Sequence, residues 1–286
     1  MKVAITAASG QLGSQVVEAL LALIPSTNIV GLARTTAKAK HLGIEIRPGD
    51  YNEKGLLEES LRSVDAVLLV SGMDAPERRI TQHRNVIEAA RSAGVRKIVY
   101  TSVQGAEHDT AFSPIVQSNR QTEEDVRYSG LAWAIGRNGI YIEPDVEYLE
   151  SYKKAGGITN CAADGRCGYT TRSELAYAYA RMLTEDKHNG RTYNLHGAAI
   201  TQYELADYLN STFGTDLTYT PMTVEEYRAD RVAELGEFMG TVITGIYQGI
   251  RDGEADNPSH YLEAAGREHV SWPAFFAGLR QEKATS

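Results

Sequence analysis

Apolar runs and amphipathic stretches alternate along the first half of the chain. Short apolar runs that favour strands occupy residues 2–6, 28–33, 44–47, 66–70, 97–101 and 132–136. Between them, apolar residues recur at spacings of three and four, which predicts helices at residues 12–23, 55–62, 80–93 and 115–129. This alternation is typical of βαβ units in a parallel sheet. Because several runs are apolar throughout, we expect helices on both faces of the sheet.

The alternation weakens after Tyr141. Amphipathic patterns still predict helices at residues 174–183, 202–213, 224–235 and 238–250, and residues 192–195 form a further candidate strand. The sequence therefore predicts an α/β fold with two parts. Residues 1–142 are expected to form a Rossmann-type, doubly wound parallel sheet. Residues 143–286 are expected to form a smaller, mainly helical portion, from which some segments return to the sheet.

Composition excludes several classes of protein. A hydrophobic fraction of 42% over 286 residues is ordinary for a globular protein, and a formal charge of -8 argues against a nucleic-acid surface. The two cysteines, Cys161 and Cys167, lack the clustered ligands that zinc requires, so we expect reduced thiols. The start of the chain lacks a signal-peptide core, and the apolar stretch 19–24 is far shorter than a membrane span. We therefore expect a soluble, cytoplasmic protein that contacts neither membranes nor nucleic acid.

A turn typical of dinucleotide-binding folds follows the first predicted strand. The candidate cofactor-binding residues in this turn are Thr6, Ser9, Gly10, Gln11, Leu12 and Gly13. Gly10 would let phosphates approach the backbone, Gly13 would let the helix pack on the sheet, and the N-terminus of the helix would attract the anion. The first glycine of the motif is replaced by Ala7, for which we expect a negative φ, a slightly displaced turn and weaker but surviving binding. A glycine-rich turn without a ligand remains the alternative.

Charge at the end of the second strand indicates which dinucleotide is bound. Arg34 stands where an acidic residue would bind the ribose hydroxyls of NAD, and Lys38 follows it. A guanidinium at this place pairs with the 2′-phosphate of NADP, although a solvated basic surface is the alternative. Asp50 and Tyr51, after the third strand, are candidates to bind the adenine amino group and to cover the base.

Small polar residues follow the remaining strands of the predicted sheet. The candidates to line the path of the cofactor are Val70, Ser71, Gly72, Thr101, Ser102, Asn138 and Gly139. Asn138 and Gly139 would frame a nicotinamide. They also form a dipeptide that favours positive φ, so a plain turn remains equally open.

The sequence shows no obvious catalytic acid or base. No Tyr precedes a Lys by four residues, so the proton relay of standard short-chain dehydrogenases is absent. No histidine pair has metal-binding spacing, and neither a nucleophile elbow nor a Walker turn occurs, which leaves redox chemistry and predicts no metal. Tyr141, Tyr148, Tyr152 and Tyr169 lie where a cleft is expected and would stack on a flat acceptor, with ordinary half-buried tyrosines as the alternative.

Several motifs together resemble one family. They are Ile5-Thr6-Ala7-Ala8-Ser9-Gly10-Gln11-Leu12-Gly13, Arg34, Gly49-Asp50-Tyr51-Asn52, Gln82-His83-Arg84-Asn85-Val86, Ala93-Gly94-Val95, Tyr100-Thr101-Ser102, Arg137-Asn138-Gly139, Thr171-Arg172-Ser173-Glu174-Leu175-Ala176, Gly190-Arg191-Thr192-Tyr193-Asn194-Leu195 and Gly253-Glu254-Ala255. With them the chain resembles the NmrA-like atypical short-chain dehydrogenase/reductases, and within these the bacterial NAD(P)H quinone oxidoreductase and triphenylmethane reductase branch. The resemblance extends over almost the whole chain.

This resemblance implies an enzyme that binds NADPH and transfers hydride to a quinone or a similar planar, electron-poor acceptor. It also implies a substrate cleft, in which we expect Asn119, Tyr141 and Tyr169. The branch often carries His a few residues before a Thr-Glu pair, and Asn119 takes that place before Thr122. The alternative is a dinucleotide-binding redox sensor without turnover, since the family contains such regulators. The expected partner is a small planar molecule, and a homodimer is left open.

Overall fold

A seven-stranded sheet forms the larger part of the molecule in the computed structural model, which describes residues 1–285. Its strands are β1 (Val3–Ile5), β2 (Ile29–Ala33), β3 (Glu45–Pro48), β4 (Ala66–Leu69), β5 (Lys97–Val103), β6 (Ala132–Asn138) and β10 (Arg191–Leu195). They lie in the order β10-β6-β5-β4-β1-β2-β3, and all pairs are parallel. The strand order reverses between β1 and β4, and ligands of open α/β sheets bind at such a point. The Rossmann-type, doubly wound fold expected from the sequence is confirmed.

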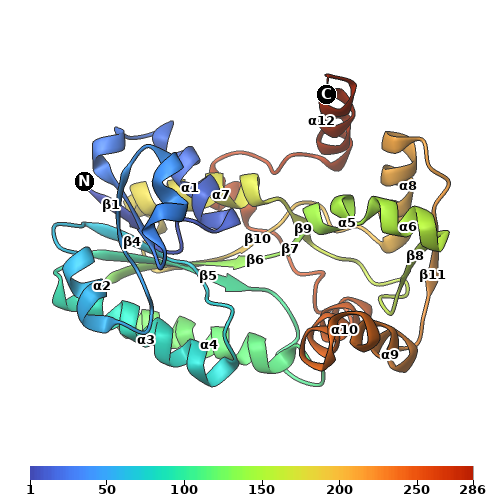
Figure 1. The fold of residues 1–286 in the computed structure, drawn as a ribbon, viewed down its shortest axis with the longest axis horizontal. Coiled ribbons are helices and arrows are strands. Elements are labelled where there is room, and N and C mark those ends of the chain that lie inside the picture. Colours follow the sequence, from blue (N-terminus) through green and yellow to red (C-terminus); the bar gives the residue numbers. More distant parts are fainter. Residues whose placement is uncertain (286) are drawn as a thin grey trace.

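Helices cover both faces of this sheet (Figure 1). One face carries α1 (Gln11–Leu21), α7 (Arg172–Thr184) and the short α11 (Tyr261–Ala265), and the other carries α2 (Lys54–Ser60), α3 (Pro76–Ser92) and α4 (Ser113–Arg127). Every residue of β1, β2 and β4 is buried, as a sheet covered on both faces requires. α7, β10 and α11 follow residue 142 and still belong to this part of the molecule.

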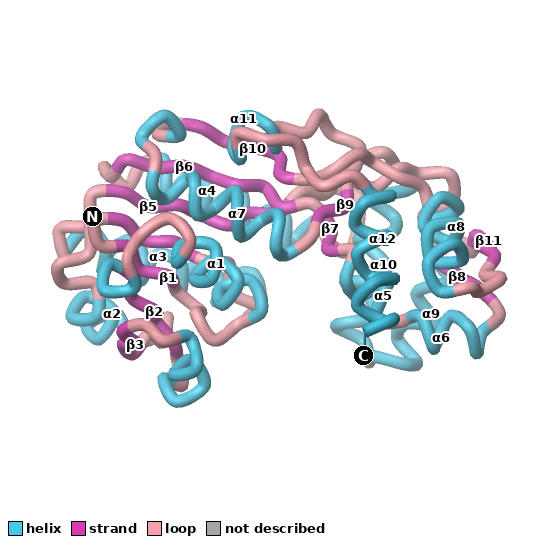
Figure 2. The backbone as a smooth tube through the Cα atoms, turned by 90° about the horizontal axis from the view of Figure 1, so that it is seen from above, coloured by secondary structure: helices cyan, strands magenta, loops and turns pink. Residues whose placement is uncertain are grey.

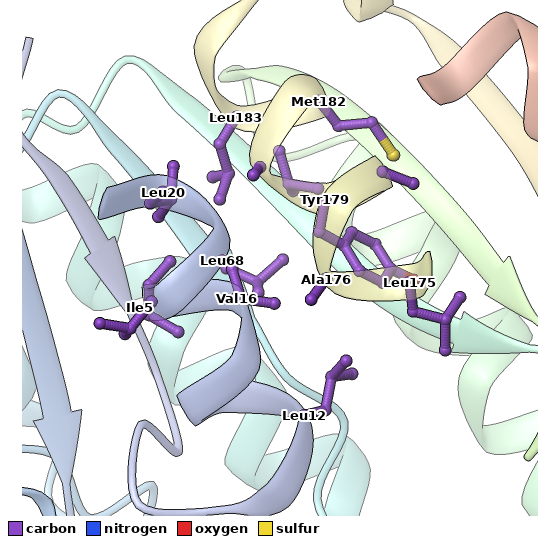
Figure 3. Close-up of a cluster of buried hydrophobic side chains, with 14 of the residues drawn as sticks. Ile5, Leu12, Val16, Leu20, Leu68, Leu175, Ala176, Tyr179, Met182 and Leu183 are labelled. Atoms are coloured by element: carbon purple, nitrogen blue, oxygen red, sulfur yellow. The ribbon is translucent and has the colours of Figure 1, made fainter. Parts of the chain in front are cut away.

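The contact between α1 and α7 shows how helical spacing builds the core on one face. Leu12, Val16 and Leu20 recur along α1 and point toward α7 (Figure 3). Leu175 and Tyr179 approach them from α7, which begins where the Thr171 side chain accepts a hydrogen bond from the Glu174 amide. This packing holds the N-terminus of α1 at the carboxyl edge of the sheet.

A second group of elements lies at the end of the molecule opposite β2 and β3 (Figure 2). It contains α5 (Glu143–Glu147), α6 (Leu149–Ala155), α8 (Gln202–Phe213), α9 (Val224–Leu235), α10 (Glu237–Arg251) and α12 (Trp272–Thr285). Two small parallel pairs accompany them, β7 (Ile140–Tyr141) with β9 (Tyr169–Thr170) and β8 (Gly157–Asn160) with β11 (Thr218–Pro221). Ile158, Leu205, Trp272 and Phe276 form part of its separate core. Three 3-10 turns, η1 (Ser26–Asn28), η2 (Thr36–Leu42) and η3 (Asp186–His188), complete the elements of the chain.

Several elements departed from the sequence pattern, among them the helices α5, α6, α11 and α12, for which no helix was predicted. The strands β7, β8, β9 and β11, of two to four residues, were also missed, whereas the equally short β1 and β4 were found because they are continuous apolar runs. Helix α3 begins at Pro76, not at residue 80, because proline is favoured in the first turn of a helix. Its first turns bury Arg79, Gln82 and His83, so apolar periodicity could not reveal them. Among residues 1–285, no helix is both long and apolar enough to cross a membrane.

Candidate functional site

A cavity of about 490 Å³ lies at the carboxyl edge of the sheet, where the strand order reverses. It is lined by Ala7, Ser9, Gly10, Arg34, Thr35, Lys38, Gly49, Asp50, Tyr51, Asn52, Val70, Ser71, Gly72, Met73, Asp74 and Gln82. These residues come from the segments that follow β1, β2, β3 and β4, and from α3. The volume is in the range of small-molecule and cofactor sites.

The turn from β1 into α1 forms one wall of this cavity. A Cβ atom at Gly13 would overlap the carbonyl oxygen of Ala7, so only glycine lets α1 start this close to the strand. The Gly10 amide donates to the same oxygen at 2.8 Å and closes the turn. No side chain caps α1 and no acidic residue lies in its first turn, so its first amides can bind an anion. Ser9, Gly10 and Gln11 are exposed, whereas Leu12 and Gly13 are buried beneath them and support the turn.

Ala7 adopts a conformation that the sequence did not lead us to expect. Its φ is +48°, in the left-handed region, so the predicted negative φ was wrong. The Ala7 carbonyl contacts both the Gly10 amide and the start of α1. Ala7 keeps these two contacts although a left-handed φ costs a residue with a Cβ about 1 kcal/mol or more.

Thr6 supports the cavity from below and does not line it. Its side chain is fully buried, and its hydroxyl donates to the Leu68 carbonyl at 2.9 Å while accepting from the Val70 amide at 2.9 Å and the Tyr51 hydroxyl at 2.5 Å. The ring of Tyr51 therefore lines the cavity with its hydroxyl tied down, and burial raises the pKa of that hydroxyl. The hydrogen-bonding capacity of the Thr6 side chain is therefore used within the sheet, and its contact with a cofactor stays a prediction.

The end of β2 gives the cavity a basic side. Arg34 and Lys38 are exposed, and no carboxylate in the described part of the chain pairs with either. Asp50 lines another side and accepts from the Asn52 amide at 2.9 Å and from the Asn52 side chain at 2.8 Å. The cavity thus combines free cationic groups with a fixed carboxylate.

Helix α3 holds three parts of the cavity wall. Gln82 donates to Asn52 at 3.2 Å and to Asp74 at 2.5 Å, and Asn85 donates to the Tyr51 carbonyl at 2.9 Å. The sequence analysis used the motif around these residues only as a mark of resemblance, and their contacts were missed. Two of the partners, Asn52 and Tyr51, lie 30 and 34 residues away along the chain, so no local pattern identified these contacts.

His83, in the same motif, fixes the loop after β4. Its Nε2 accepts from the Gly72 amide at 2.9 Å, which leaves the hydrogen on Nδ1 to donate to the Thr122 hydroxyl at 2.9 Å. Burial, together with the smaller effect of the Arg79 charge, lowers the pKa of His83 to about 3. The imidazole is therefore neutral near pH 7 and acts as an acceptor for the loop.

The ends of β4 and β5 are joined by hydrogen bonds behind the cavity wall. The Thr101 hydroxyl accepts from the Ser71 amide at 2.8 Å. Asn119 Oδ1 accepts from the Ser71 hydroxyl at 3.0 Å and from the Tyr100 hydroxyl at 2.6 Å, and the Asn119 side-chain amide donates to the Ile115 carbonyl. Asn119 is only 2% exposed. Ser71, which lines the cavity, donates to Asn119 from the cavity side, and the contact of Asn119 with substrate stays a prediction.

Ser102 belongs to a buried ion network and not to the cavity. Its hydroxyl donates to Glu123 at 2.7 Å, and Arg120, Arg127 and Arg137 donate to the same carboxylate. Burial alone would raise the pKa of Glu123, but hydrogen bonding to Arg137 and the nearby positive charges outweigh it and lower that pKa. The Ser102 side chain therefore serves this network, and its contact with a cofactor stays a prediction.

Asn138 and Gly139 do not form a turn with positive φ, so the plain-turn alternative is wrong. Asn138 ends β6 and accepts from the Tyr179 hydroxyl at 2.5 Å, while Gly139 allows a close approach to Gly168 that a Cβ would block. Tyr141 follows in β7, half-buried, with the Arg172 guanidinium 5.0 Å from its ring centre. Burial raises the pKa of Tyr141 to about 12.

Tyr169 lies inside the second core, not on a cleft wall. It is fully buried, and its hydroxyl accepts from Gln202 at 3.0 Å, so the prediction that it contacts substrate is corrected. Tyr152 donates to Asp145 at 2.7 Å, and burial raises the pKa of that carboxyl to about 6. Tyr148 is 39% exposed. The four tyrosines therefore do not form one aromatic wall.

A second, polar cavity of about 390 Å³ lies at the ends of β5, β6 and β10, and the sequence analysis did not identify it. It is lined by Gln104, Gly105, Glu107, His108, Asp109, Arg120, Arg137, Asn194, Glu254 and Asn257. Its residues come from five distant segments. Three of them, Arg137, Asn194 and Glu254, lie in motifs that carry the resemblance, but no single motif indicates that they share a cavity.

Comparisons with known proteins agree with this geometry. A family model described as NAD(P)H-binding matches residues 7–186. Quinone oxidoreductase 2 of Escherichia coli K12 is 36% identical over 231 residues, which cover 79% of this chain and 80% of the relative.

Two solved structures superpose on almost the whole chain. Citrobacter sp. triphenylmethane reductase complexed with NADP(H) has a TM-score of 0.89 at 33% identity, covering 97% of this chain and 99% of the other. An NADPH-dependent quinone oxidoreductase from Escherichia coli complexed with NADPH has a TM-score of 0.84 at 30% identity, with the same coverage. These matches confirm the resemblance drawn from the motifs. Because the family model spans more than half of the chain and starts at the turn that forms the cavity wall, the protein belongs to the NAD(P)H-binding family.

Proposed function

We propose that this protein is an NADPH-dependent oxidoreductase that reduces a quinone or a similar planar, electron-poor acceptor. The observation that carries the proposal is the cavity at the strand reversal, with an uncapped helix on one side and the unpaired Arg34 and Lys38 on another. The related proteins named as quinone oxidoreductase and triphenylmethane reductase support the same reaction class.

The residues of the cavity fit NADPH chemically. The turn at Gly10 and Gly13 has no Cβ at either glycine and leads into the first amides of α1, which no side chain caps, and this suits a pyrophosphate. Arg34 and Lys38 carry the charge that a 2′-phosphate needs, and Asp50 can accept from an adenine amino group. When bound, NADPH supplies a hydride.

The chain's own residues do little proton chemistry. The Tyr100 and Tyr152 hydroxyls already donate to Asn119 and Asp145, and burial raises the pKa of both. Neither is a convenient acid near pH 7. Positioning must then carry the catalysis, which favours acceptors that take up a hydride without needing a proton from the protein.

Turnover tests the proposal. The purified protein should oxidise NADPH when a simple quinone is added, followed by the loss of NADPH absorbance. NADPH binding without any quinone- or dye-dependent oxidation would overturn the enzyme assignment and favour the alternative, a redox sensor that signals through a protein partner.

Three further points belong to this proposal. Residues 1–142 bind the dinucleotide, and parts of residues 143–286 shape the acceptor side, where Tyr141 is the expected residue still half-exposed. The protein acts in the cytoplasm on a small molecule, without a membrane or nucleic acid. Sedimentation of the purified chain tests whether it forms a homodimer.

A further inference from the structure

The buried face of α3 is polar in the first turns of the helix and apolar toward its C-terminus. Toward its C-terminus it buries Val86, Ile87 and Ala90, whereas its first turns bury Arg79, Gln82 and His83. Gln82 and His83 each hold a part of the cavity wall through the hydrogen bonds described above. Arg79 is different, because its guanidinium holds no part of that wall.

Arg79 is a buried positive charge that no carboxylate pairs with directly in the described part of the chain, although the charge of Asp74 acts on it. It is 4% exposed, its Nε has no hydrogen-bond partner, and its one side-chain contact is a weak one of 3.5 Å from Nη1 to the Ser118 hydroxyl. It forms no ion pair with any carboxylate that the structure describes. Asp74 is engaged by Gln82 at 2.5 Å, and Arg78 lies 3.9 Å from the same oxygen. Burying an unpaired guanidinium opposes folding, so packing does not explain this residue.

The position of Arg79 connects it with the candidate site. It contacts Ser118 on α4, and its charge acts on the Tyr100 hydroxyl. That hydroxyl donates to Asn119, which also accepts from Ser71, and Ser71 lines the cavity. The charge therefore lies behind the wall at the ends of β4 and β5. In a buried, weakly polarisable setting, its field acts over several ångströms with little screening.

We propose that Arg79 determines acceptor specificity, favouring acceptors that become anionic when they receive a hydride over acceptors that are cationic. The inference rests on the proposed function, and it takes the reacting ring of the cofactor to lie at the carboxyl ends of the neighbouring strands β4, β5 and β6, where Asn138 and Gly139 are expected to frame it. A neutral quinone gains a negative charge during the reaction, which a nearby unpaired cation stabilises. A cationic triarylmethane dye is repelled by the same charge before it reacts.

The charge of Arg79 should affect the two acceptors in opposite directions, because a quinone becomes an anion and a cationic dye becomes neutral. In both reactions a C–H bond of the reduced nicotinamide breaks and its electron pair leaves with the hydrogen, so NADPH becomes NADP⁺. A quinone takes up this hydride to form the hydroquinone monoanion, which then takes a proton from water. A triarylmethane cation takes up the hydride at its central carbon and becomes neutral.

Three variants separate this role from a structural one. Arg79→Met removes the charge and keeps the length of the side chain, and Arg79→Lys keeps the charge. Arg78→Met is the matched control, because it removes one positive charge at the neighbouring position, where the side chain is 66% exposed. For each protein, kcat/KM is measured for benzoquinone and for a cationic triarylmethane dye.

The ratio of the two kcat/KM values is the main readout. We expect Arg79→Met to lower the quinone-to-dye ratio by about tenfold or more, and Arg79→Lys and Arg78→Met to stay within about threefold of the unmodified protein. Equal ratios in Arg79→Met and Arg78→Met would overturn the proposal.

Two readouts do not need turnover. NADP⁺ carries one more positive charge on its ring than NADPH, so Arg79→Met should tighten NADP⁺ relative to NADPH by several-fold, measured by titration calorimetry. It should also raise the Tm, because it removes an unpaired buried charge. A lower Tm with an unchanged NADP⁺-to-NADPH affinity ratio would show a structural role and overturn the proposal. If the unmodified protein turns over no acceptor, the proposed function fails, and the affinity ratio still tests Arg79.

Discussion

The carbonyl oxygen of Ala7 occupies the space that a Cβ atom at Gly13 would need. The first turn of α1 is therefore held against the end of β1 by a direct backbone contact. Gly13 is required by this close approach and not by its own φ, which is not positive. The relationship explains why the turn survives without the first glycine of the motif, since the last glycine makes the contact.

Gly13→Ala should damage both folding and cofactor binding. The added methyl group must displace α1 or the turn, and overpacking of this kind costs about 1 to 3 kcal/mol of unfolding free energy. NADPH affinity should fall by about tenfold or more, measured by fluorescence titration beside urea unfolding. Gly55→Ala is the control, because a Cβ there meets nothing within 4 Å. Equal losses in the two variants would contradict the contact argument.

Ala7→Gly should change little. The φ of +48° costs alanine about 1 kcal/mol, but glycine gives back a similar amount through the entropy of the unfolded chain. We expect the unfolding free energy to stay within about 1 kcal/mol and NADPH affinity to stay equal or become a few times tighter. A clear loss of affinity in titration would show that the methyl group itself contributes to the site.

Arg34→Ala should weaken NADPH far more than NADH. The lost charge-assisted contact to a phosphate is worth about 1.5 to 3 kcal/mol, or roughly ten- to a hundredfold in Kd. NADH, which lacks the 2′-phosphate, should bind the variant about as well as the unmodified protein. Lys40→Ala is a suitable control, since Lys40 is exposed and does not line the cavity. Equal affinities for NADPH and NADH in the unmodified protein would refute the assignment.

Removing single tyrosine hydroxyls should not abolish turnover. We expect Tyr→Phe at 141, 148, 152 and 169 to keep quinone reduction within about tenfold, because a positioned acid would contribute about 10² to 10⁴. Loss of the hydrogen bond from Tyr152 to Asp145 should instead lower stability by about 1 kcal/mol. Simple ketones should be poor acceptors. A thousandfold loss at one tyrosine, or fast ketone reduction, would reveal a hidden proton donor.

His83 should make stability depend on pH in the acid range. Its pKa falls from 6.5 to about 3 on folding, so between these values the unfolded chain binds more protons than the native protein. The contribution is fully present above pH 6.5 and is lost as the pH falls toward 3, by up to about 1.4 kcal/mol per unit. Urea unfolding from pH 4 to 7 should show a flatter profile for His83→Gln than for His41→Gln, a control at an exposed position. Parallel profiles would show that His83 does not carry this slope.

Local pattern determined the architecture of the larger part of the chain. The alternation of apolar runs and helical spacing places β1 to β6 and α1 to α4 within a few residues, because each element buries its own apolar positions. The charge of Arg34 and the glycines of the turn likewise indicate the place of the site, since they lie at the ends of strands. These features depend on residues close together in sequence.

Tertiary structure alone decided which polar residues face the cavity. Thr6, Ser102, Asn119 and Tyr169 are buried because partners from distant segments satisfy their hydrogen bonds. Arg79 differs from these residues, because its buried Nε has no hydrogen-bond partner. A sequence pattern cannot predict that a buried group lacks a partner. The period of a helix shows which residues point inward, but the chemistry found there is set by elements that only the folded chain brings together.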